Sequence, residues 1–68
     1  MEDENTKVKV MIDFIVDQLY YGYEIVDIEI EHKNLWEDIK LLEIVKNILK
    51  KEGKTLTYNK ETLKLTIR

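Results

Sequence analysis

The sequence predicts a two-layer α+β domain with the element order αβαββ, in which two helices cover one face of a three-stranded sheet. Apolar residues recur every three or four positions over about 6–21 and 35–52, and they alternate with polar residues over three other stretches. The only two glycines, Gly22 and Gly53, follow the two helical patterns directly. A chain of 68 residues has room for one domain, which we expect to span residues 1–68.

The first predicted helix covers residues 6–21. Its main apolar face, which we expect to meet the core, consists of Val8, Met11, Ile12, Ile15, Val16 and Leu19. Gly22 comes directly after the last periodic residue, where a left-handed cap commonly ends a helix.

The first predicted strand covers residues 24–32, where the period changes from helical spacing to two. Its apolar side carries Val26, Ile28 and Ile30. Its other side carries Asp27, Glu29 and Glu31. We therefore expect one side of this strand to face the core and the acidic side to face water.

The second predicted helix covers residues 35–52. Asn34 precedes it and Glu37 follows three residues later, which is the pattern of a capping box. Its expected core face consists of Ile39, Leu42, Val45 and Leu49. Gly53 is expected to end the helix.

The last two strands, over about 54–58 and 62–68, form a hairpin around the turn at 59–62. A helix joins the first strand to the second, so we expect these two to run parallel, with the third antiparallel, in a mixed sheet. Lys64 and Arg68 on the third strand match the acidic side of the first. This charge match predicts the order 1-3-2, with strand 3 central, both helices on the apolar face and the opposite face open to water.

Several classes of function lack the residues they need. The chain has no cysteine, no serine and one histidine, so neither a nucleophile with its base nor a cysteine–histidine zinc site can be assembled. Two glycines 31 positions apart form no phosphate-binding loop. The net charge of −3 opposes binding to nucleic acid, although several lysines lie near Trp36. We expect no enzyme activity, no cofactor or metal, and no nucleic-acid partner.

The N-terminal residues are acidic, and no apolar run approaches the length of a membrane span. We therefore expect a cytoplasmic protein if the chain is natural, without a membrane partner.

A second apolar stripe indicates a partner surface. Val10, Phe14 and Tyr21 project roughly opposite the main face of the first helix, and we add Trp36 to this surface. If the stripe is exposed, it favours self-association or binding to another protein. The alternative is that neighbouring side chains cover it, because the surfaces of folded proteins are largely apolar in any case.

The chain is unusually regular. Both glycines lie at helix ends, the strands alternate cleanly, and proline is absent. In this pattern the whole chain resembles computationally designed (de novo) small idealised α+β proteins, and Gly22-Tyr23 and Gly53-Lys54 resemble their short helix-to-strand loops. The resemblance implies a stable scaffold with no biochemical function and no partner. The other hypothesis is a small non-enzymatic protein-binding or dimerising module from an AT-rich organism or a mobile element.

Overall fold

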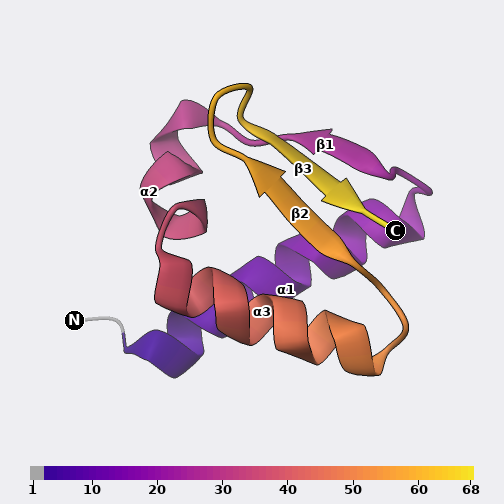
Figure 1. Ribbon diagram of the computed structural model, residues 1–68, viewed down its shortest axis with the longest axis horizontal. Helices are drawn as coiled ribbons and strands as arrows, with labels where there is room; N and C mark the ends of the chain where they lie inside the picture. The colour runs from indigo at the N-terminus through magenta and orange to yellow at the C-terminus, as the bar shows by residue number, and fades with distance from the viewer. Residues whose placement is uncertain (1–2) are drawn as a thin grey trace.

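The computed structural model describes residues 3–68, which form a helical layer packed against a small sheet (Figure 1). In chain order the elements are α1 (Glu4–Tyr20), β1 (Ile25–Asp27), the 3₁₀ helix η1 (Ile30–His32), α2 (Lys33–Trp36), α3 (Ile39–Lys51), β2 (Leu56–Asn59) and β3 (Lys64–Ile67). Helix α1 packs against α3, and α3 contacts β2. The predicted α+β fold is confirmed, and residues 3–68 contain three α-helices in place of the predicted two.

The sheet has the order β1-β3-β2, so the prediction that the third strand is central is confirmed. Asp27 lies opposite Lys64 in the register, and the Asp27 Oδ1 to Lys64 Nζ distance is 2.9 Å. The charge match that predicted this order is therefore present as an ion pair. The prediction of a mixed sheet is wrong, because both neighbouring pairs are antiparallel. Strands β1 and β2 do run in the same direction, but β3 separates them.

Both ends of α1 are capped through local hydrogen bonds. The carboxylate of Asp3 accepts a hydrogen bond from the Thr6 N–H at 2.8 Å, so the helix begins two residues before the predicted start. This bond and the Thr6 hydroxyl lower the pKa of Asp3. Beyond the other end, Gly22 has φ +81° and its N–H donates to the Leu19 carbonyl, as the sequence predicted for a glycine cap.

The predicted strand over 24–32 is wrong in its second half. Strand β1 ends at Asp27, and the last pairing bond beyond it runs from the Ile28 N–H to the Leu63 carbonyl at 2.7 Å. Leu63 belongs to the hairpin turn and has φ +55°, so β3 offers the chain no partner further along. The segment therefore turns into η1, and Ile30, a predicted core residue, is 73% exposed.

The predicted helix over 35–52 is divided in two. Helix α2 ends at Trp36, and α3 begins at Ile39 because the Asp38 carboxylate accepts hydrogen bonds from the N–H groups of Lys40 and Leu41. The predicted capping box at Asn34 and Glu37 is therefore wrong. The break also changes the buried face of α3, since Leu41 is buried and Ile39 is exposed.

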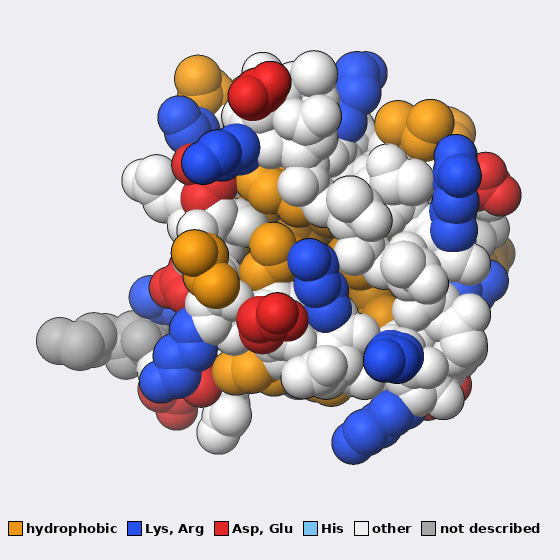
Figure 2. All heavy atoms as spheres, in the orientation of Figure 1, with side chains coloured by type: hydrophobic (Ala, Val, Ile, Leu, Met, Phe, Trp, Pro, Cys, Tyr) orange, Lys and Arg blue, Asp and Glu red, His pale blue; other side chains and the backbone are white. Residues whose placement is uncertain are grey.

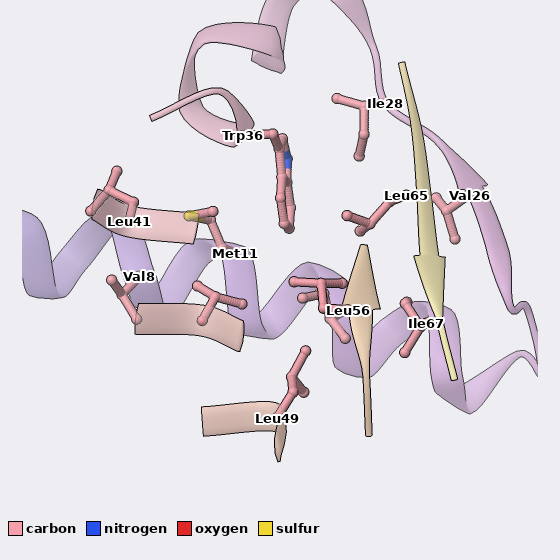
Figure 3. Close-up of a cluster of buried hydrophobic side chains, with 12 residues drawn as sticks. Val8, Met11, Val26, Ile28, Trp36, Leu41, Leu49, Leu56, Leu65 and Ile67 are labelled. Atoms are coloured by element: carbon pink, nitrogen blue, oxygen red, sulfur yellow. The ribbon is translucent and has the colours of Figure 1, made fainter. Parts of the chain in front are cut away.

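The core lies between the helices and the sheet, and Trp36 points into it from α2 (Figure 3). Its buried side chains are Val8, Met11, Ile15, Val26, Ile28, Trp36, Leu41, Val45, Leu49, Leu56, Leu65 and Ile67. No charged or polar side chain of residues 3–68 is buried with them. Burial of apolar surface therefore supplies most of the stabilisation of this fold.

Tyr58 joins β2 to the corner between α2 and α3, and this contact predicts a pH dependence. The Tyr58 hydroxyl donates a hydrogen bond to Glu37 Oε2 at 3.2 Å. Partial burial raises the pKa of Tyr58, and the bond to Glu37 raises it further. The folded state thus holds this proton more tightly than the unfolded state does. The stabilisation is complete below the unfolded pKa of about 10 and is lost as the pH rises through the folded value.

Tyr58→Phe should therefore lower the free energy of unfolding by about 0.5–1.5 kcal/mol at neutral pH, the usual contribution of one hydrogen bond. The difference between the two proteins should shrink as the pH rises above about 10. Urea titrations of both proteins at about pH 8 and about pH 11 measure this difference in the free energy of unfolding. The lysines also titrate in this range, but they are the same in both proteins and so do not change the difference. A difference that stays constant across this range would show that the hydroxyl is not coupled to folding.

Candidate functional site

A pocket of about 160 Å³ lies between α1 and the segment that follows β1. Helix α1 contributes Val10, Met11 and Phe14, the end of β1 contributes Asp27, Ile28 and Glu29, and η1 and α2 contribute His32, Leu35 and Trp36. Most of these side chains are apolar. Elements far apart in sequence therefore build one recess beside the sheet.

The pocket combines a buried base with an exposed wall. Met11 is fully buried, and Trp36 is 2% exposed. The ring of Phe14 packs on Trp36 with 5.8 Å between the ring centroids and an angle of 60° between the planes. Val10 is 49% exposed, so the wall formed by α1 remains open to solvent. Core packing fixes the base of the recess, and an apolar group can still reach it.

The edge of the pocket is acidic. Glu29 Oε2 lies 4.0 Å from His32 Nδ1, and both side chains are largely exposed, as is that of Asp27. Within residues 3–68, no group of three histidine, cysteine or acidic side chains is placed to hold a metal ion. The apolar wall and base of the pocket, beside an exposed acidic edge, are suited to binding an apolar group.

Three of the four residues of the predicted partner surface meet in this pocket. Val10, Phe14 and Trp36 all line it. Trp36 is buried at the base of the pocket, so it does not lie on the molecular surface to which the sequence assigned it. Tyr21 lies elsewhere, at the end of α1, where its ring packs on Tyr20 with 5.4 Å between the centroids. Tyr21 does not line the pocket, because it lies eleven residues beyond Val10 in the sequence, about 16 Å along the helix axis.

The sequence reasoning missed His32 and Leu35 as neighbours of Trp36. Their spacing of three and four residues is that of one helical face, which was a usable signal. The regular alternation over residues 24–32 predicts a strand that continues to His32, and this obscures the helical spacing.

A second, more open hollow lies between the β2–β3 hairpin and the start of α3, and hydrophobic side chains show through it in Figure 2. Tyr58, Leu42 and Ile39 line it together with Glu37, Lys60 and Glu61. It carries more polar groups than the first pocket and has a wide mouth, so it encloses a ligand less well.

None of the helices within residues 3–68 is both long enough and apolar enough to cross a lipid bilayer. Comparison of the chain with models of protein families, with curated proteins and with solved structures finds no match.

Proposed function

We propose that this chain is a small non-enzymatic protein-binding module, and that the pocket between α1 and α2 receives an apolar side chain of its partner. The observation that carries the proposal is the combination of the buried Trp36 base, on which the partly buried Phe14 ring packs, with the half-exposed Val10 wall. Protein interfaces depend on a few anchoring side chains that fill such recesses.

The volume of the pocket sets the size of the anchor. A closed apolar cavity of about 150 Å³ holds one benzene molecule, so about 160 Å³ fits a leucine or phenylalanine side chain. Burying such a side chain contributes about 1.5–3 kcal/mol. This amount is too small for stable binding alone, so the partner must also contact the surface around the pocket.

A designed scaffold with no biochemical function is the second candidate, and the capping of both long helices favours it. Gly22 and Gly53 each have positive φ, and Asp3 and Asp38 each cap a helix start. Leu63 departs from an idealised backbone, because it adopts φ +55° without being glycine. A monomer that stays folded above about 90 °C and binds no apolar probe is the outcome that supports this candidate.

Titration with N-acetyl-leucinamide, a blocked single residue, tests the proposed anchor site. Millimolar affinity is expected for a ligand of this size, with chemical shift changes at Val10, Phe14 and Trp36. Val10→Glu should abolish these changes, because the pocket would have to desolvate a charge.

Val16→Glu is the matched control, because Val16 is 55% exposed on the same helix and does not line the pocket. It should bind the probe as the unchanged chain does. Phe14 is a poorer test position, since its ring also packs on Trp36 and its loss would disturb the core. Equal binding by both glutamate variants, or no binding by the unchanged chain, would refute the proposed site.

A further inference from the structure

The outer edge of β1 has unused backbone hydrogen-bonding groups. The Ile67 N–H donates to the Glu24 carbonyl, and the Ile28 N–H donates to the Leu63 carbonyl. In an antiparallel pair the bonded positions alternate, so Glu24, Val26 and Ile28 turn their backbone groups toward β3. The N–H and C=O groups of Ile25 and Asp27 therefore point away from the sheet. Among residues 3–68, no strand pairs with this edge.

The edge lies directly beside the pocket. Asp27, Ile28 and Glu29, at the end of β1, form part of the pocket lining. Side chains alternate between the two faces of a strand. In a strand added to this edge, every second side chain would therefore face the helices, and the side chains between them would lie on the open face of the sheet. A strand placed along β1 would thus bring alternate side chains toward Val10 and Phe14. The remaining side chains would lie next to Ile25 and Asp27.

The charges around this edge are mostly negative. Glu24, Asp27, Glu29 and Glu31 are all exposed and lie within eight positions of one another. Lys64 pairs with Asp27, and His32 lies near Glu29. The local excess of negative charge remains, and it favours a positively charged partner.

We infer that the partner of this module is an extended, basic peptide segment, which adds to the free edge of β1 as a strand and inserts an apolar side chain into the pocket. This inference rests on the proposed function for the pocket, and it adds the backbone pairing and the charge of the partner. Addition of a strand to a sheet edge is a common mode of peptide recognition, in which backbone bonds give affinity and pockets give specificity.

A second copy of the chain fits this edge less well. Antiparallel pairing of β1 with itself across Val26 would place Ile25 of one copy opposite Asp27 of the other. It would also bring both sets of acidic side chains together, which is unfavourable. The charge of the edge therefore selects a basic segment over self-association.

The test uses the blocked peptide acetyl-Lys-Thr-Lys-Leu-Lys-Thr-Lys-amide, which places lysines on one face of a strand and leucine on the other. Binding should slow hydrogen exchange at the amides of Ile25 and Asp27, since these become paired. Affinity should fall as salt is added. A peptide with glutamate in place of every lysine should bind at least about tenfold more weakly, because the charge match is reversed.

Two double variants of the protein isolate the charge contribution. Glu24→Lys with Glu29→Lys should weaken binding of the lysine peptide about tenfold, from two charge contacts of about 0.7 kcal/mol each. Glu43→Lys with Glu52→Lys makes the same change in net charge at two exposed positions, one in α3 and one at its C-terminal cap, and should leave affinity within about twofold. Equal losses in both variants would show that only net charge matters and would overturn the inference.

Substitution of the peptide leucine by serine separates the inference from the proposed function. If the amides of Ile25 and Asp27 become protected but the leucine makes no difference, the edge binds peptide and the proposed pocket function fails. If binding needs the leucine but these amides stay unprotected, the pocket function stands and the inference fails. No binding of the lysine peptide at millimolar concentration, or protection of these amides by dimerisation of the chain alone, also overturns the inference.

Discussion

Trp36→Ala should lower the free energy of unfolding by about 3–5 kcal/mol, the usual cost of removing a large buried aromatic side chain. Trp36 is 2% exposed and points from α2 into the centre of the core (Figure 3). Its loss removes apolar contact with the sheet and takes away the ring on which Phe14 packs. Domains of this size have total stabilities of about 3–10 kcal/mol, so the variant should be largely unfolded or close to it.

Circular dichroism during urea titration measures this effect, because the variant has no tryptophan fluorescence to follow. Tyr21→Ala is the control, since Tyr21 is an aromatic residue on the surface and its loss should change stability by at most about 0.5 kcal/mol. A loss below about 1 kcal/mol for Trp36→Ala would place the indole on the molecular surface, where a partner surface that includes Trp36 requires it to lie.

The error about Trp36 has a local cause. A continuous helix over 35–52 places Trp36 on the same side as the lysines, and the periodic pattern gave no reason to interrupt that helix. Asp38 does interrupt it, by capping the N–H groups of Lys40 and Leu41. Because the chain turns at Glu37 and Asp38, α2 can run in a different direction from α3. Two candidate caps four residues apart have similar local energies, so tertiary packing decides between them.

The strand order, in contrast, follows from features that can be read in the sequence. The hairpin fixes β2 beside β3, and the opposite charges of Asp27 and Lys64 then favour β1 on the other side of β3. The direction of each pair also follows once β3 is central, because β3 is antiparallel to β2 through the hairpin and β1 runs in the same direction as β2. The prediction of a mixed sheet was wrong because β1 and β2, which run in the same direction, do not pair with each other.

The pocket was predictable only in part. Val10 and Phe14 stand four residues apart on one helix, so their shared side could be identified from spacing alone. Spacing also places Tyr21 on this side of the helix, but Tyr21 lies about three helical turns beyond Val10 and does not line the pocket. Spacing gives the side of a helix on which a residue lies, whereas the position of the pocket along the helix depends on the segment that packs against it.

Ile28→Ala is the second change with a large expected effect, and it should lower the free energy of unfolding by about 2–5 kcal/mol. The side chain is 4% exposed and forms part of both the core and the pocket lining. The Ile28 N–H makes the last pairing bond with Leu63, so the backbone there is fixed and the space left by the missing methyl groups cannot easily close.

Ile30→Ala is its matched control, because the sequence assigns Ile28 and Ile30 to the same face of one strand, whereas the structure separates them. Ile30 is 73% exposed in η1, so the same truncation there should change stability by no more than about 0.5 kcal/mol. Urea titration of the two variants beside the unchanged chain measures the difference. A strand that continues to residue 32 predicts similar large losses for both isoleucines. If the chain turns away from the sheet after Ile28, only the Ile28 variant should lose stability.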